Sequence, residues 1–198
     1  MPRTIQQLDE IKQARRAEIL DAALKVFARR GLEATKITDI AEQAGVSHGL
    51  LYHYFPTKEA VFEAIIERSV SDGLTIIDEA ERSTPDAWLA LERIVDAFLA
   101  GLRERTEFNR ILAVAVSSEA APPGIRLVIQ QSEDLVLDRL IALIDCCERD
   151  GRIPPGNAAG RALALTALIQ GLAIFGAYGG RFATTFPARE TVLALLKG

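Results

Sequence analysis

Cysteine and histidine are both scarce in this chain. Its 198 residues include two cysteines, the neighbours Cys146 and Cys147, and two histidines, His48 and His53. Two adjacent cysteines are too few and too close for the disulfide framework of a small secreted domain, so they fit a reducing compartment. Adjacent helical residues point about 100° apart, so we expect both thiols to be small core side chains, with a redox or metal-sensing role as the alternative.

The scarcity of histidine limits the chemistry that the chain can carry. On a helix, two histidines five residues apart point about 140° apart and do not chelate one ion. Beyond residue 57 the sequence has no histidine to pair with serine or cysteine, no metal-ligand cluster and no glycine-rich phosphate loop. We therefore predict that the protein is not an enzyme and that it has no catalytic residues, no metal and no cofactor.

A signal-peptide pattern is missing as well. The first twenty residues, MPRTIQQLDEIKQARRAEIL, carry many charges and lack the apolar run of a secretory signal. Residues 162–180, ALALTALIQGLAIFGAYGG, are nineteen residues without a charge, so a membrane span has to be weighed. This stretch is poor in large apolar residues and has small residues four apart, which suits close packing of helices in a soluble dimer. We expect a cytoplasmic protein without a membrane span.

An excess of positive charge is also lacking, because the formal net charge is −4. The charge is unevenly distributed, however. Residues 1–36 carry eight Lys and Arg against five Asp and Glu, whereas residues 71–198 carry thirteen against seventeen. A low overall pI is therefore compatible with a local basic surface for nucleic acid at the N-terminal end.

The hydrophobic pattern has a helical period nearly everywhere, and no window alternates apolar and polar residues as a strand does. We predict an all-α fold of about nine helices. The first strong helix carries one apolar stripe that ends at Gly31, and its members are Ile19, Ala22, Ala23, Val26 and Phe27. Another long helix is expected after Pro56, with Thr57 as its N-cap and a stripe of Val61, Phe62, Ile65 and Ile66.

The segment ITDIAEQAGVSHGLLYHYF at residues 37–55 predicts two short helices joined by a tight turn at Gly45. A helical wheel places Leu51, Tyr54 and Phe55 on the inner side of the second helix, with Ser47 as its cap. The outer side then carries His48, Gly49, Leu50, Tyr52 and His53. This arrangement is a helix-turn-helix, whose second helix enters the major groove of DNA.

These residues also carry a resemblance to a known family. The run from Arg16 to Phe62 contains GLEAT, DIAEQAGVS and LYHYFPTKE in the order and spacing of the TetR (tetracycline repressor-like) family of transcriptional regulators. The resemblance covers about a quarter of the chain. It implies an N-terminal three-helix DNA-binding domain, set here at residues 1–56, and a C-terminal helical effector-binding and dimerisation bundle at residues 57–198.

The resemblance also implies roles for individual residues. Tyr52, His53 and Lys58 match phosphate contacts of the family, and Thr38 matches a position that reaches DNA from the preceding helix. Lys36 stands where the family has a capping Ser or Thr, so we expect Thr35 to supply that cap and Lys36 to remain free for phosphate. The predicted DNA-contacting set is Lys36, Thr38, Ser47, His48, Gly49, Leu50, Tyr52, His53 and Lys58.

For the C-terminal bundle the sequence provides candidates only. Aromatic and polar side chains suited to an effector pocket are Trp88, Phe98, Phe108, Arg110, Glu119, Gln130, Gln170, Phe175 and Tyr178. Residues expected at a dimer interface, formed in relatives by the last two helices, are Ala167, Gly171, Ile174, Tyr178, Val192 and Leu195.

The resulting expectation is a homodimeric repressor that a small apolar or aromatic ligand releases from a palindromic double-stranded DNA operator. The sequence leaves two alternatives open. One is a helix-turn-helix regulator controlled by a protein partner or by no effector, and the other is an activator.

Overall fold

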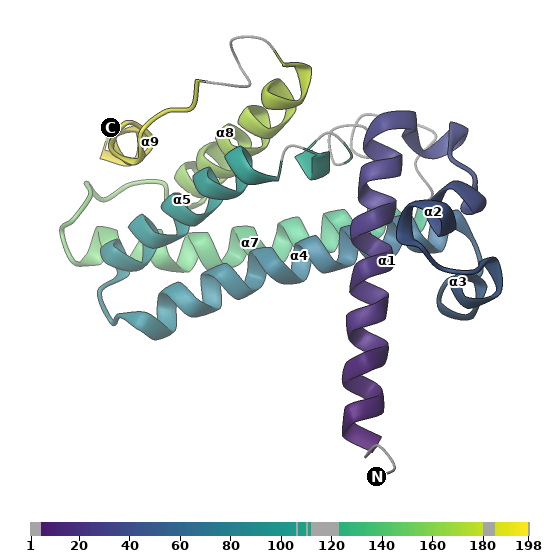
Figure 1. Cartoon of the computed structure of the whole chain (residues 1–198). Helices are drawn as coiled ribbons and strands as arrows, with labels where there is room; N and C mark the ends of the chain where they lie inside the picture. Colours follow the sequence, from purple (N-terminus) through teal and green to yellow (C-terminus); the bar gives the residue numbers. More distant parts are fainter. Residues whose placement is uncertain (1–4, 106, 110, 112–122, 180–184, 198) are drawn as a thin grey trace. The chain divides into compact units, whose positions relative to one another are not determined.

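The computed structural model describes residues 5–105, 107–109, 111, 123–179 and 185–197 of the chain. Over these residues it contains α-helices and no strand, which confirms the predicted all-α fold (Figure 1). Their bounds are α1 Ile5–Ala34, α2 Ile37–Ala44, α3 His48–Tyr54, α4 Lys58–Ser83, α5 Ala87–Glu104, α7 Pro123–Arg149, α8 Ala158–Tyr178 and α9 Arg189–Lys197. The chain forms two compact units, Met1–Glu67 and Arg68–Gly198.

The core of the N-terminal unit is built from the predicted apolar stripes. All five stripe residues of α1 are buried, and so are the four predicted at the start of α4. The rings of Phe27 and Phe62 meet edge to face, with centroids 5.3 Å apart. Thr57 caps α4 as predicted, because its Oγ1 accepts a hydrogen bond from Ala60 N at 3.1 Å.

Helix α1 is interrupted at the predicted glycine. Gly31 has φ 76° and ψ 169°, a backbone conformation that residues other than glycine rarely adopt. Helical residues nevertheless continue for one short turn to Ala34, so Gly31 marks a kink rather than the last residue of the helix. This kink leaves the carbonyl groups of the final turn in need of other hydrogen-bond donors.

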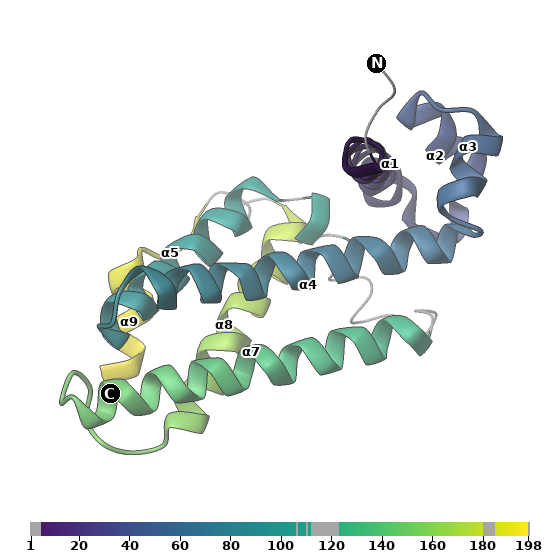
Figure 2. The same ribbon diagram turned by 90° about the horizontal axis from the view of Figure 1, so that it is seen from below.

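The core of the C-terminal unit lies among α5, α7, α8 and α9, where α7 packs against both α5 and α8 (Figure 2). Polar contacts between helices add to the apolar packing. Arg139 on α7 pairs with Asp78 and Glu81 on α4, and Arg161 on α8 pairs with Glu148 on α7. Cys147 is fully buried and its burial raises the pKa of the thiol to about 11, which agrees with the predicted core role.

Helix α9 is held on α5 by charged side chains at both of its ends. Arg189 pairs with Asp96 at 2.7 Å, and the ammonium of Lys197 lies 4.8 Å from the centre of the Trp88 ring. Val192 of α9 is 1% exposed and belongs to the core of its own chain. Its predicted place in a dimer interface is therefore wrong, because the side chain is already covered by intrachain packing. Leu195, in contrast, is 65% exposed.

Helix α8 exposes an apolar face. Its inner side buries Ala162, Leu165 and Ala173, whereas Leu163 and Phe175 are exposed, together with Ala164 and Ala167. Within the described part of the chain, one helical segment, Ala158–Ala177, is long enough and apolar enough to cross a membrane. Of the window that meets this criterion, 17% is buried inside the structure. Length and composition alone are weak evidence for a span, and a face of small side chains equally suits packing against another helix.

Candidate nucleic-acid interface

The turn between α2 and α3 has the geometry that the sequence predicts. Gly45 adopts the left-handed conformation with φ 63° and ψ 33°. Gly45 N donates to Glu42 O at 3.1 Å and Val46 N donates to Ala41 O at 3.0 Å, a pair of bonds that closes the end of α2. Ser47 then caps α3, because its Oγ accepts from Leu50 N at 3.2 Å. The two short helices are thus connected by three residues, Gly45, Val46 and Ser47.

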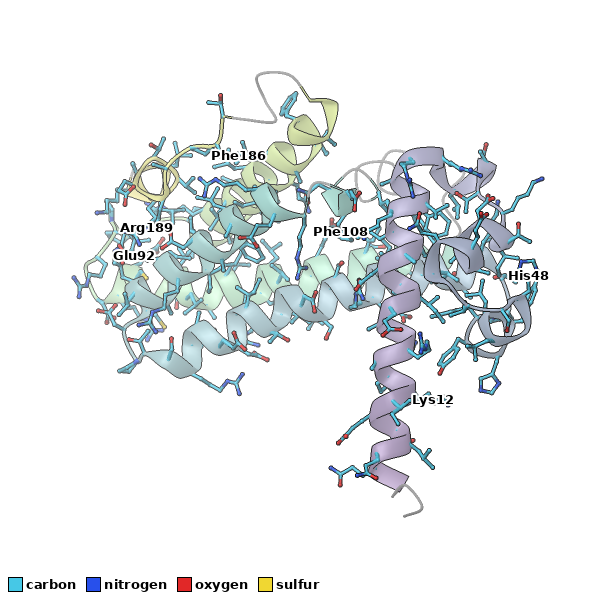
Figure 3. All side chains as sticks on the ribbon, viewed as in Figure 1. Lys12, His48, Glu92, Phe108, Phe186 and Arg189 are labelled. Atoms are coloured by element: carbon cyan, nitrogen blue, oxygen red, sulfur yellow. The ribbon has the colours of Figure 1, made fainter. Side chains whose placement is uncertain are left out.

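Helix α3 is anchored by one side chain and leaves its other face open. Leu51 is buried, and Phe55 directly after the helix is buried as well. The predicted outer residues are all exposed, with Tyr52 at 53%, and His48 stands at the outer edge of this unit in Figure 3. Tyr54 departs from its predicted core position, since it is half-buried with its ring edge-on to that of His53 at 5.5 Å.

The start of α2 shows a different cap from the expected one. Thr35 is buried and its Oγ1 donates to Gly31 O at 2.6 Å. Its hydroxyl therefore satisfies a carbonyl group near the end of α1 and does not cap α2. Asp39 takes part of the capping role, because its Oδ2 accepts from Lys36 N at 2.9 Å. The side chains of Lys36 and Thr38 are exposed, as the prediction of DNA contact requires.

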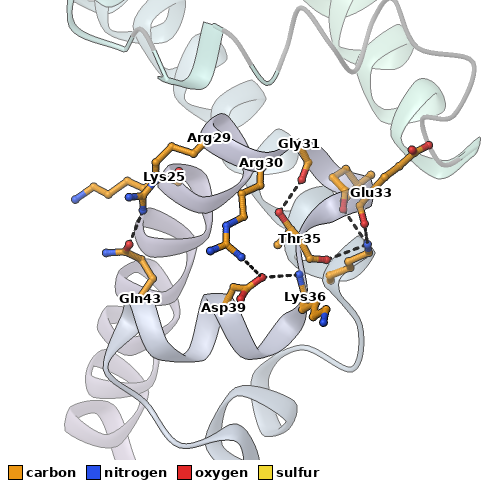
Figure 4. Close-up of polar contacts among 11 residues, drawn as sticks. Lys25, Arg29, Arg30, Gly31, Glu33, Thr35, Lys36, Asp39 and Gln43 are labelled. Carbon is orange, nitrogen blue, oxygen red and sulfur yellow. Dashed lines mark hydrogen bonds and ion pairs between the residues drawn. The ribbon is translucent and has the colours of Figure 1, made fainter.

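Asp39 also ties α2 to α1, a role that sequence reasoning missed. Its carboxylate pairs with Arg30 at 2.8 Å, and beside it Arg29 donates to Gln43 Oε1 at 2.5 Å (Figure 4). The backbone N–H of Lys36 and the guanidinium of Arg30 lower the pKa of Asp39 below its usual 3.8. The signal available in the sequence was an acidic residue three positions after the N-cap residue Lys36.

We expect Asp39→Asn to lower the Tm of the N-terminal unit by a few degrees near neutral pH. Because the folded-state pKa of Asp39 is depressed, its stabilising effect is complete above the unfolded pKa and is lost as the pH falls through the folded value. The difference in Tm between wild type and variant should therefore shrink as the pH falls below about 4. Thermal unfolding followed by far-UV circular dichroism over a pH series measures this, and a constant difference would contradict it.

The side chain of Lys58, a member of the predicted DNA-contacting set, makes three hydrogen bonds within the protein. It is half-buried, and its Nζ donates to the carbonyl oxygens of Leu32, Glu33 and Thr35 at 2.8, 2.8 and 3.0 Å. An ammonium has three N–H donors, and all three are used by these carbonyl groups. The phosphate contact expected for Lys58 is therefore not available to this side chain in the structure.

The predicted effector residues lie in different settings. Phe98 packs against the core, Trp88 donates its indole N–H to Glu92 Oε1 at 3.0 Å, and Gln170 donates to Glu133 Oε1 at 2.9 Å. Phe108 is half-buried, whereas Gln130 and Phe175 are exposed. Arg110, Glu119 and the side chain of Tyr178 lie outside the described residues.

Comparison with known proteins agrees with this geometry. Residues 19–65 match the family model described as bacterial regulatory proteins, tetR family. The chain is 38% identical over 95 residues to the uncharacterized HTH-type transcriptional regulator YfiR of Bacillus subtilis, covering 48% of this chain and 46% of YfiR. It is 40% identical over 84 residues to the HTH-type transcriptional repressor KstR2 of Rhodococcus jostii, covering 42% and 41%. The matches thus span less than half the length of these relatives.

A solved structure extends the likeness of fold to most of the chain. The transcriptional regulator FadR of Bacillus subtilis, solved in complex with stearoyl-CoA, superposes with a TM-score of 0.75 over 91% of this chain and 97% of its own. The sequences are 19% identical, so this likeness concerns the fold alone.

The fold and the exposed face of α3 define a helix-turn-helix DNA-binding protein. Residues 19–65 match the tetR family of bacterial regulatory proteins, and the relatives that this part of the chain resembles are transcriptional regulators.

Proposed function

We propose that the protein is a cytoplasmic, homodimeric repressor that binds a palindromic operator and is released from it by a small apolar ligand. The observation that carries the DNA-binding part is the exposed face of α3, held from behind by Leu51 and Phe55. Its outer residues offer hydrogen-bond donors for phosphate and for base edges, and Gly49 allows close approach of the backbone.

The exposed face of α8 supports the homodimer. A wheel drawn at 100° per residue brings Ala164, Ala167, Gly171 and Phe175 onto one side, opposite the buried residues of the helix. A Cβ added to Gly171 meets nothing within 4 Å, so this side of the helix is open for another chain. A second copy would bury the same face by two-fold symmetry. Such a dimer would carry two α3 helices to successive major grooves, about 34–36 Å apart.

The effector belongs to the C-terminal unit in this proposal. FadR has the same fold and was solved with stearoyl-CoA, which supports an apolar ligand class. Phe98 and Phe108 are aromatic side chains of this unit that remain partly exposed. Helix α4 contributes residues to both units, so a ligand that favours a shifted α4 would alter the DNA-binding state through its differential affinity.

Selection of bound sequences from a random double-stranded DNA pool, at one stated salt concentration, tests the proposal. A palindrome with half-sites about one helical turn apart is the expected result. Failure of a folded, dimeric protein to enrich any sequence would overturn the operator function and point to control through a protein partner. Measuring the level of transcription from a promoter that carries the selected site, with and without the protein, then distinguishes repression from activation.

Two substitutions on α3 should have different effects on binding. Tyr52→Phe removes a hydroxyl expected to donate to phosphate, so the affinity should fall about tenfold for every DNA sequence alike. His48→Ala should instead change the preferred base at one position of each half-site, because a base-edge contact is lost. Repeating the selection with both variants measures this. A changed base preference with Tyr52→Phe, or an unchanged one with His48→Ala, would contradict the assignment.

A further inference from the structure

The end of α1 is closed by side chains that come from outside the helix. The last four carbonyl groups of an α-helix lack partners within it, and the kink at Gly31 disturbs this turn further. Thr35 donates its hydroxyl to Gly31 O (Figure 4). The ammonium of Lys58 donates to the carbonyl oxygens of Leu32, Glu33 and Thr35. A cation at this end is also favoured by the helix dipole.

Lys58 thereby joins two segments that are far apart in sequence. It is the first residue of α4, and its three acceptors lie 23 to 26 positions earlier, at the end of α1 and in the connection to α2. That connection is only two residues long, Thr35 and Lys36. Fixing Thr35 O therefore fixes the point from which α2 starts, and α3 follows α2 after three residues.

The geometry points to Lys58 as a positioning residue that orients the helix-turn-helix and does not bind phosphate. The inference rests on the proposed function for its effect on DNA binding. Loss of the ammonium leaves three carbonyl groups without their donor and loosens residues 32–40, so binding weakens for every sequence. The number of phosphates that the protein contacts stays the same, because Lys58 is not one of the contacts.

The salt dependence of binding separates positioning from phosphate contact. Each phosphate neutralised by Lys or Arg contributes about −0.9 to the slope of log K against log salt concentration. We would compare wild type, Lys58→Met and the matched control Lys36→Met, which removes the same charge from an exposed side chain in the same unit. The probe is a labelled duplex carrying the selected site, or a random-sequence duplex if none is selected, titrated between about 50 and 200 mM salt.

For Lys58→Met we expect about tenfold weaker binding at every salt concentration with an unchanged slope. For Lys36→Met the slope should become shallower by about 0.9 per subunit. A shallower slope with Lys58→Met, like that expected for Lys36→Met, would overturn the inference and make Lys58 a phosphate contact.

Amide hydrogen exchange gives a second readout that needs no DNA. Residues 32–40 should exchange about tenfold faster in Lys58→Met than in wild type and at the wild-type rate in Lys36→Met. If Lys58→Met fails to fold, Lys58→Gln replaces it. This variant also removes the charge, and its amide has two N–H donors for the three carbonyl groups, so it should also speed exchange without changing the salt slope. Unchanged exchange in the folded variant would overturn the inference. If wild type binds no DNA, the proposed function fails, while exchange still decides whether Lys58 holds this turn.

Discussion

Replacing Leu51 with alanine is expected to abolish specific DNA binding and to destabilise the N-terminal unit by about 3 kcal/mol. Leu51 is 1% exposed and is the buried residue of α3, a helix of seven residues. A helix this short is not stable by itself, so its orientation depends on the packing of that side chain. Removing the side chain leaves a cavity under α3 and frees the recognition face from its support.

Leu50→Ala is the matched control for the stability effect. Leu50 precedes Leu51 on the same helix and is 38% exposed, so its truncation should change the free energy of unfolding by less than about 0.5 kcal/mol. Far-UV circular dichroism in a denaturant series and hydrogen exchange of α3 measure both variants. Equal stability of the two variants, or retained operator binding by Leu51→Ala, would show that α3 is not held by this contact.

Introducing glutamate at Gly171 is expected to convert the proposed homodimer to a monomer. The site has open space for a Cβ within its own chain, so the substitution should leave the fold of the subunit intact. In a two-fold interface both copies would bury a carboxylate without a partner, at about 2 kcal/mol or more each. The dissociation constant of the dimer should therefore rise about a thousandfold or more. Sedimentation velocity at micromolar concentration reports the change.

The control for this variant is Ala159→Glu. Ala159 is exposed in the first turn of the same helix, and its side chain points about 120° away from that of Gly171. A glutamate in the first turn is compatible with the helix dipole, so this variant should remain dimeric. A dimer that survives Gly171→Glu would show that α8 uses another surface, and dissociation of both variants would point to a general effect of charge on this helix.

Local features of the DNA-binding unit were predictable from the sequence because each depends on a few consecutive residues. Gly45 and Ser47 determine a turn and a cap through their own backbone and side-chain chemistry, and the structure confirms both. The apolar stripe of α1 follows from helical periodicity, and every member of it is buried. The placement of His48 and Tyr52 on an exposed face of α3 follows from the same periodicity.

Two outcomes that the sequence did not predict depend on residues that are distant in sequence. Lys58 was expected at phosphate because its motif position suggested it, yet its acceptors are carbonyl groups more than twenty residues earlier. Val192 was expected at a dimer interface because its helix is amphipathic, yet its own chain covers it.

The sequence by itself therefore determined the helices, the helix-turn-helix and the face of α3 that is open to DNA, because periodicity, caps and glycine turns act over one or two helical turns. The tertiary structure decided which donor satisfies the end of α1 and which side of α9 is free. Those outcomes depend on carbonyl groups and apolar surfaces whose partners come from distant parts of the sequence. These partners come into contact only after the chain has folded, so local sequence patterns do not predict them.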